Sequence, residues 1–222
     1  MNASIANPSP APDAVVIGGS AGGIEALNVL LPMLPAAFRP ALIVVLHLRP
    51  DTPSLLPQLF SLRCALPVCE AEDKMPVRHG HLYLAPPDYH LLVERDSRHG
   101  GAYSGSHVGT PVGNLGSERA EGVHFALSVD PPERFSRPSI DVLFESAAHA
   151  WREALLGILL SGANDDGARG LETIRRCGGR TWVQAPDTAS AETMPAEAIA
   201  RGAVDEVLTL EAIGSRLRRA VH

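Results

Sequence analysis

The sequence predicts an α/β fold: a Rossmann-like, mostly parallel sheet with helices on both faces and a β-hairpin insertion. Short aliphatic and β-branched runs alternate with amphipathic segments along most of the chain, which is typical of βαβ units. Several of these runs are apolar throughout, as are strands that a parallel sheet buries on both faces. With 222 residues, 45% of them hydrophobic and 20% charged, the chain can bury its own core.

The first half of the chain begins with a proline-rich tail, residues 1–12, which we expect to be disordered. A single domain then follows over residues 13–222. The β-branched run 14–17 predicts a strand, and its glycine-rich turn leads into a segment with apolar residues at helical spacing. The next expected elements are a strand at Ala41–Leu46, a helix over 52–62, a strand at 66–70, and runs at 81–85 and 89–94 that form a hairpin around a Pro-Pro-Asp turn.

The second half resumes the βα alternation after a glycine-rich segment, 97–123, that predicts a flexible surface loop. A helix is expected after Ser139, which is a favoured N-cap residue, with Asp141 as an acid in its first turn. The remaining expected elements are a strand at 155–160, a helix at Ala168–Arg176, a strand at 181–184, a helix at 195–201, a short strand at Glu206–Leu208 and a helix at 210–220.

Composition and charge exclude several classes of protein. Nineteen basic and 25 acidic residues give a net charge of −6 without a dense basic run, so we expect no nucleic-acid partner. The apolar runs are much shorter than the roughly 20 residues of a membrane span, and the N-terminus does not resemble a signal peptide. We therefore predict a cytoplasmic protein without membrane insertion. The three cysteines lack CxxC spacing, and we assign no metal and no cofactor.

Polar residues follow three of the predicted strands at the point where each strand ends. Ser20 follows the first strand, His47 follows the second, and Asp165 and Asp166 follow the strand at 155–160. In an open parallel sheet these carboxyl ends share one edge, which is where ligands bind. A serine becomes a nucleophile when a histidine accepts its proton and a carboxylate orients that histidine. The pattern thus indicates a catalytic triad of Ser20, His47 and an aspartate.

The turn around Ser20 matches G-x-S-x-G, in which a serine lies on a sharp turn between a strand and a helix. Gly19, Ala21 and Gly22 would form the oxyanion turn, in which backbone amides near Ala21 and Gly22, at the start of the helix, hold the oxyanion. The chain order Ser, His, Asp differs from the Ser, Asp, His order of α/β-hydrolases, so the triad would require a different fold.

A dinucleotide-binding oxidoreductase is the alternative that the same strand-turn-helix unit suggests. Such a site requires G-x-G-x-x-G and an acidic residue at the end of the second strand to bind the ribose. Here Ser20 occupies the position of the middle glycine, and His47 stands at the end of the second strand. Both residues count against this alternative.

Six ordered motifs resemble the catalytic domain of the protein-glutamate methylesterases of bacterial chemotaxis. They cover most of residues 15–213 and read IGGSAGG at 17–23, VLHL at 45–48, LYLAPPDYH at 82–90, RPSIDVLF at 137–144, LLSGANDDGARG at 159–170, and MP at 194–195 with GAVD at 202–205. The chain departs from the family pattern at Ala21, where threonine is common, and at Ala163, where methionine is common.

The resemblance implies a serine hydrolase that removes methyl groups from glutamate γ-methyl esters on chemoreceptors, with glutamine deamidation as a second activity. It implies Ser20 as nucleophile, His47 as base and Asp166, rather than Asp165, as the orienting carboxylate. The implied partners are the cytoplasmic region of a methylated chemoreceptor and a separate receiver or other chemosensory protein. Full-length family members carry a receiver domain ahead of the catalytic one, and residues 1–12 are too few to encode it. A non-catalytic signalling module on the same fold remains the second alternative.

Overall fold

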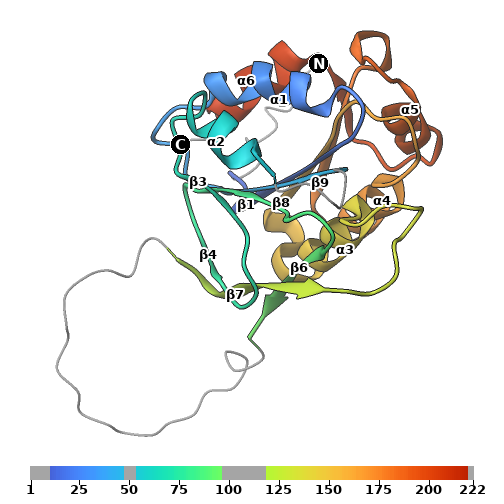
Figure 1. Ribbon diagram of the computed structural model, residues 1–222. Helices are drawn as coiled ribbons and strands as arrows, with labels where there is room; N and C mark the ends of the chain where they lie inside the picture. The colour runs from blue at the N-terminus through green and yellow to red at the C-terminus, as the bar shows by residue number, and fades with distance from the viewer. Residues whose placement is uncertain (1–10, 48–53, 97–118, 220–222) are drawn as a thin grey trace, which may run out of the picture.

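The computed structural model describes residues 11–47, 54–96 and 119–219, and its centre is a seven-stranded sheet (Figure 1). All neighbouring strands in this sheet run parallel, in the order β10-β9-β8-β1-β2-β5-β3. The strands are β1 (Ala14–Gly19), β2 (Ala41–Leu46), β3 (Val68–Glu70), β5 (Leu82–Leu84), β8 (Leu155–Leu159), β9 (Arg180–Gln184) and β10 (Glu206–Leu208). The predicted mostly parallel sheet is confirmed.

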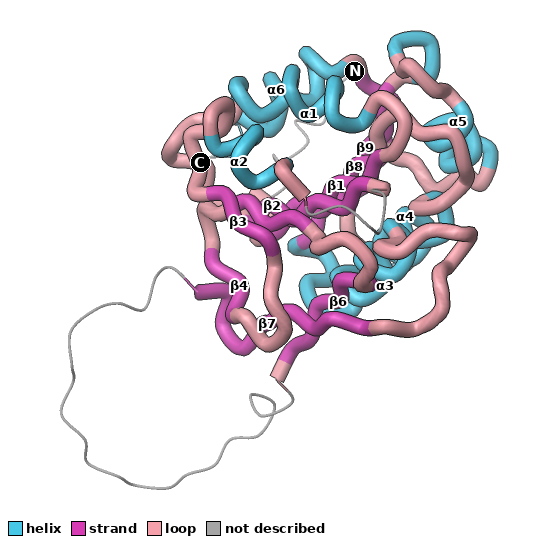
Figure 2. Tube along the Cα trace, in the orientation of Figure 1, coloured by secondary structure: helices cyan, strands magenta, loops and turns pink. Residues whose placement is uncertain are grey.

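Helices cover both faces of this sheet, as Figures 1 and 2 show. Helices α1 (Gly23–Leu30), α2 (Leu56–Ser61) and α6 (Leu210–Arg219) lie on one face, while α3 (Ile140–Trp151) and α4 (Ala168–Arg176) lie on the other. Helix α5 (Thr193–Ala200) packs beside α4. Side chains alternate along β1, so that Val15 and Ile17 enter one core and Val16 enters the other. Burial on both faces explains why this strand is apolar throughout.

A second, antiparallel sheet has the order β4-β7-β6 and packs against α3. Its strands are β4 (Pro76–Arg78), β6 (His90–Arg95) and β7 (Arg119–Ser128). It contributes Val77, Leu91 and Phe125 to the core shared with α3 and α4. The small sheet therefore enlarges the apolar layer beneath one face of the main sheet.

The antiparallel insertion was expected, but the predicted pairing of its strands was wrong. The runs 81–85 and 89–94 do not form a hairpin with each other. Strand β5 from the first run joins the main sheet between β2 and β3, and β6 from the second run pairs with β7. The Pro86-Pro87-Asp88 segment thus connects two sheets, because Leu82 and Leu84 are buried against the core on the α1 side.

Other boundaries also differ from the expectations. The glycine-rich loop predicted over 97–123 ends earlier, because β7 begins at Arg119; the part at 97–118 lies outside the described residues, as does the tail at 1–10. Helix α2 begins at Leu56 rather than at 52. Within the described ranges, no helix combines the length and the apolar composition that crossing a bilayer requires.

Candidate active site

Three of the predicted site residues follow adjacent strands at the carboxyl edge of the main sheet. Ser20 follows β1, His47 follows β2, and Asp166 lies in the segment between β8 and α4. The chain builds outward from β1 through β2 to one edge and later returns to β8 on the other side of β1. Such a reversal of strand order opens a crevice at the carboxyl ends, where α/β proteins bind their ligands.

The turn that carries Ser20 is shaped by glycine. Gly22 has a φ of 79°, in the left-handed region that residues with a Cβ avoid. A Cβ atom at Gly22 would lie 2.7 Å from Cβ of Ser190 and 2.8 Å from Oγ of Ser161. The Ser161 hydroxyl donates a 2.7 Å hydrogen bond to the carbonyl of Ala21, which fixes the turn from the neighbouring loop. Helix α1 begins at the next residue, Gly23.

Two backbone amides of this turn have no acceptor among the described residues. The amide of Ser20 donates to the carbonyl of Ser161 at 2.9 Å, and the amide of Gly23 donates to the carbonyl of Ser20 at 2.8 Å. By contrast, the amides of Ala21 and Gly22 make no hydrogen bond with any described residue. They lie at the amino end of α1, where the helix dipole favours negative charge. The turn can therefore bind an anion.

His47 joins the serine turn to the β8–α4 segment. Its backbone amide donates a 3.3 Å hydrogen bond to the carbonyl of Gly19, the residue before Ser20. Its side chain is 12% exposed, and Nε2 lies 2.9 Å from Oδ2 of Asp166. The Ser20 hydroxyl makes no hydrogen bond in the described part of the chain. The three strand ends therefore lie together, as the sequence predicts: a backbone hydrogen bond joins the first two, and the His47–Asp166 pair joins the second to the third.

Asp166 is fully buried and accepts four hydrogen bonds. Besides His47, its donors are the amide of Ile140 at 2.7 Å, the amide of Asp141 at 3.0 Å and the hydroxyl of Ser139 at 3.0 Å. Burial raises the pKa of this carboxyl, but the hydrogen bonds from His47 and the two amides outweigh burial and hold the pKa below its ordinary value. Asp166 is therefore an ionised carboxylate, and the proton in the His47–Asp166 hydrogen bond resides on Nε2.

These contacts change the expected role of Ser139 as a helix cap. Ser139 occupies the N-cap position of α3, but its side chain donates to Asp166 and makes no capping hydrogen bond. Instead, the carboxylate of Asp166 accepts from the first amides of α3. Asp166 is not the N-cap of its own helix, because Gly167 holds that position in α4. The two residues together bring the start of α3 to the histidine.

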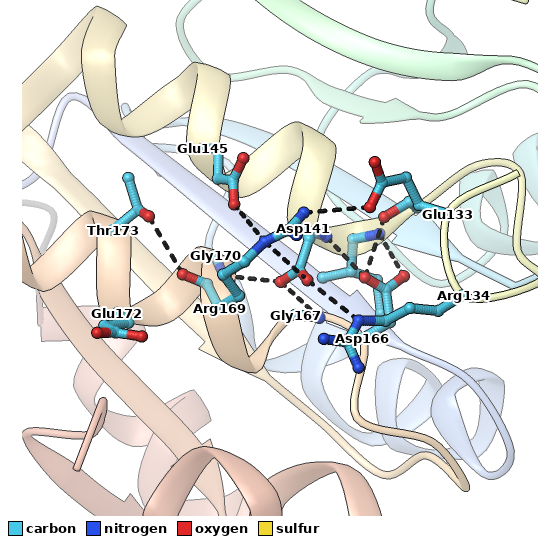
Figure 3. Close-up of polar contacts among 12 residues, drawn as sticks. Glu133, Arg134, Asp141, Glu145, Asp166, Gly167, Arg169, Gly170, Glu172 and Thr173 are labelled. Carbon is cyan, nitrogen blue, oxygen red and sulfur yellow. Dashed lines mark hydrogen bonds and ion pairs between the residues drawn. The ribbon is translucent and has the colours of Figure 1, made fainter. Parts of the chain in front are cut away.

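Asp141 in turn accepts hydrogen bonds from the first amides of α4 (Figure 3). Its Oδ1 accepts from the amide of Gly167 at 2.9 Å and from the amide of Gly170 at 2.7 Å, both at the start of α4. Its Oδ2 accepts no hydrogen bond from any residue that the structure describes, but it lies 3.5 Å from Nε of Arg169 and 3.7 Å from Nε of Arg134. Burial, followed by repulsion from Asp166, raises the pKa of Asp141 to about 6.

The two arginines connect this buried pair to the surface, and sequence reasoning did not identify them. Arg134 pairs with Asp165, and Arg169 pairs with Glu145 at 2.7 Å and with Glu133 at 3.2 Å (Figure 3). The sequence contains no motif for this network, since its members come from four separate segments. Of its members, the sequence indicates only Asp165 and Asp166, as acids after a strand, and Asp141, as a favourable charge at a helix start.

A parallel sheet with a buried Asp–His pair beside a serine turn defines the class of this protein: an α/β protein with the side chains of a serine hydrolase. Residues 15–217 match the family model described as CheB methylesterase, and the chain belongs to this family.

Curated relatives and a solved structure agree with this assignment. A putative protein-glutamate methylesterase/protein-glutamine glutaminase of Leptospira interrogans is 38% identical over 90% of this chain and 91% of the relative. The relative of Anaeromyxobacter dehalogenans is 38% identical over 95% of this chain, which spans 56% of that longer protein. The crystal structure of the Thermotoga maritima CheB methylesterase catalytic domain is 27% identical, with a TM-score of 0.80 over 94% of this chain and 98% of the domain.

Proposed function

We propose that this chain is a serine hydrolase that demethylates glutamate γ-methyl esters on chemoreceptor proteins and also deamidates glutamine. The observation that carries the proposal is the buried Asp166–His47 pair, 2.9 Å apart, at the strand end next to Ser20. Family membership and the names of the relatives supply the substrate class.

In the first step, Ser20 acts as the nucleophile and His47 as the base. Because Nε2 of His47 carries the proton that is donated to Asp166, Nδ1 is the nitrogen left to accept the proton of the Ser20 hydroxyl. The Ser20 oxygen attacks the γ-carbonyl carbon, and the ionised Asp166 stabilises the imidazolium that forms. His47 then protonates the departing methoxide, which leaves as methanol, and the γ-glutamyl group stays esterified to Ser20.

The serine turn stabilises the negative oxygen of the tetrahedral intermediate. The donors are the amides of Ala21 and Gly22, which make no hydrogen bond within the described part of the chain. Gly19 allows the close backbone approach that the turn needs, because a Cβ atom there would lie 3.3 Å from Cα of Gly23. Such donors contribute roughly 3 kcal/mol each to transition-state stabilisation when they are correctly oriented. In the predicted oxyanion turn, Ala21 and Gly22 thus donate hydrogen bonds, and Gly19 lets the backbone pack closely.

In the second step, water hydrolyses the ester between the γ-glutamyl group and Ser20. His47 removes a proton from the water, the resulting hydroxide attacks the acyl-enzyme carbonyl, and Ser20 leaves with the proton from His47. The products are a glutamate side chain and free enzyme. A glutamine side chain follows the same path with ammonia as the leaving group, so one site serves both reactions.

The proposed partner is the cytoplasmic region of a methylated chemoreceptor, and the proposed place of action is the cytoplasm. A separate receiver or other chemosensory protein is the second proposed partner. Both proposals rest on membership of the family rather than on a surface of this chain.

Methanol release from a methylated receptor fragment tests the proposal. We expect Ser20→Ala to lower the rate at least about 10³-fold, because loss of a triad member removes nearly all acceleration by the site. Ser61→Ala is the control: among the described residues, this exposed serine in α2 bonds only to the carbonyl of Pro57, and its loss should leave the rate unchanged.

The two alternatives predict other results. A non-catalytic module would release no methanol with either the wild type or the variants while still binding the receptor. Undiminished hydrolysis by Ser20→Ala would refute the assignment of the nucleophile. Saturable binding of NAD or FAD by the purified protein would favour the oxidoreductase.

A further inference from the structure

Two aspartates form reciprocal helix caps at the interface between α3 and α4. Asp166 precedes α4 but accepts hydrogen bonds from the first amides of α3, and Asp141 belongs to the first turn of α3 but accepts from the first amides of α4. Figure 3 shows both carboxylates between the two helix ends. Asp166 therefore anchors α3, which carries Asp141, and Asp141 anchors α4, which follows Asp166.

The anchor made by Asp141 acts on the residue directly after Asp166. The amide of Gly167 donates to Oδ1 of Asp141 at 2.9 Å, and Gly167 itself has a φ of 94°, in the left-handed region that favours glycine. The second anchor, at Gly170, fixes the first turn of α4. Asp141 does not contact His47. Any effect it has on the histidine must therefore pass through the backbone that carries Asp166.

Burial of a second carboxylate beside Asp166 is costly unless its charge is compensated. The groups that face Asp141 are Asp166 itself, the amides of α4, and the side chains of Arg134, Arg169 and Glu145. The two guanidinium groups lie within 4 Å of its Oδ2, which accepts no hydrogen bond. The two arginines thus offset the repulsion between the carboxylates of Asp141 and Asp166, which an uncharged residue at position 141 would avoid. Despite this cost, the carboxylate of Asp141 accepts hydrogen bonds from two amides of the turn, those of Gly167 and Gly170.

We propose that Asp141 is a positioning residue for the triad, whose carboxylate oxygen holds the turn at 166–170 so that Asp166 points at His47. This inference rests on the proposed function, since the triad is the object being positioned. Asp141 is fully buried and bonds to the start of α4 rather than to His47 or Ser20, so its effect falls on the alignment of the His47–Asp166 hydrogen bond.

Asp141→Ala and Asp141→Asn separate positioning from charge. The alanine variant leaves both α4 amides without an acceptor, and we expect kcat for methanol release to fall about tenfold or more while KM changes less than about twofold. The asparagine variant has a carbonyl oxygen in the same place, and we expect kcat within about threefold of the wild type. Restoration by the isosteric residue is the signature of a geometric role.

A second readout does not depend on activity. The proton between Nε2 of His47 and Asp166 should give a downfield ¹H NMR resonance in the wild type and in Asp141→Asn. In Asp141→Ala this resonance should move upfield or disappear through faster exchange. If the wild type released no methanol but the resonance behaved in this way, the proposed function would fail and the positioning role would stand.

Asp205→Asn is the matched control. Asp205 also accepts from a backbone amide, that of Thr181, and pairs with an arginine, Arg175, but it lies at the opposite, amino-terminal edge of the sheet. We expect this variant to lower thermal stability without changing kcat or the resonance. Equal losses in Asp205→Asn and Asp141→Ala would overturn the proposal, as would wild-type behaviour of Asp141→Ala or an Asp141→Asn variant as impaired as the alanine variant. If Asp141→Ala does not fold, Asp141→Ser, whose side chain is one atom shorter, takes its place with the same expectations.

Discussion

The hydroxyl of Ser139 donates a 3.0 Å hydrogen bond to Oδ1 of Asp166, and both side chains are completely buried. Hydrogen bonds to a charged acceptor contribute about 1.5–3 kcal/mol to folding. We therefore expect Ser139→Ala to lower the free energy of unfolding by about 2 kcal/mol. We also expect kcat to fall about three- to tenfold, because Oδ1 keeps only the amide of Asp141 as a donor.

Urea unfolding and methanol release measure the two effects. Ser146→Ala, in the helix that follows Ser139, is the control, because its hydroxyl accepts from the amide of Val93 and donates to carbonyls of its own helix rather than to a residue of the site. It should lose stability and keep its kcat. A Ser139→Ala variant with unchanged kcat would show that Asp166 does not need this donor for the reaction.

Asp165 and Asp166 are adjacent in sequence but differ in environment. Asp166 is buried against His47, while Asp165 is half-buried and pairs with Arg134. We expect Asp166→Asn to lower kcat about 10³–10⁴-fold, because a neutral amide neither stabilises the imidazolium nor selects its tautomer. Asp165→Asn should stay within about twofold of the wild type. Side-by-side kcat measurements decide the assignment, and the reverse ranking would transfer the orienting role to Asp165.

The raised pKa of Asp141 has a consequence for stability. Between the ordinary value of 3.8 and about 6, the folded protein keeps a proton on this carboxyl that the unfolded chain has released. Stability therefore falls as pH rises through this window, by on the order of 3 kcal/mol from this group. Asp166 acts in the opposite sense, because its lowered pKa contributes stability above the ordinary value that is lost as pH falls.

Asp141→Asn isolates the first contribution, since the variant keeps Asp166 and the two arginines but lacks the titrating carboxyl. We expect its free energy of unfolding, relative to the wild type, to increase from pH 4 to pH 7. Urea titrations at four pH values in this range measure the difference. Parallel curves for the two proteins would mean that Asp141 titrates at the same pH in the folded and unfolded chains.

The strand ends, and the meeting of His47 with Asp166 at the sheet edge, could be predicted because they depend on local pattern. A run such as Ala41–Leu46 is apolar throughout, and a polar residue directly after it must lie at the sheet edge. The position of β5 could not be predicted in this way. Its three residues have no periodicity, and their pairing with β2 and β3 rather than with β6 depends on which core they complete.

The support of Asp166 was missed for a different reason. The sequence shows Ser139 and Asp141 at a helix start, and local rules assign both to that helix. Their actual partners are set by how closely α3 and α4 approach, which is a property of packing between segments about 25 residues apart. Strand β7 was missed in part because its first residues continue a glycine-rich segment whose composition indicates a loop.

The close approach of α3 and α4 depends on Gly170, where a Cβ atom would lie 2.5 Å from Cβ of Phe144. The clash involves an atom attached to the backbone, so α3 itself would have to move. We expect Gly170→Ala to lower the free energy of unfolding by about 1–3 kcal/mol, although alanine is the better helix former. The shift would lengthen the 2.7 Å bond from Gly170 to Asp141, so kcat should fall as well. Glu172→Ala, at an exposed position of the same helix, should change stability by less than about 0.5 kcal/mol and leave kcat unchanged. If Gly170→Ala proved more stable than the wild type, helix propensity would outweigh the packing, and the two helices would tolerate a wider separation than the reciprocal caps require.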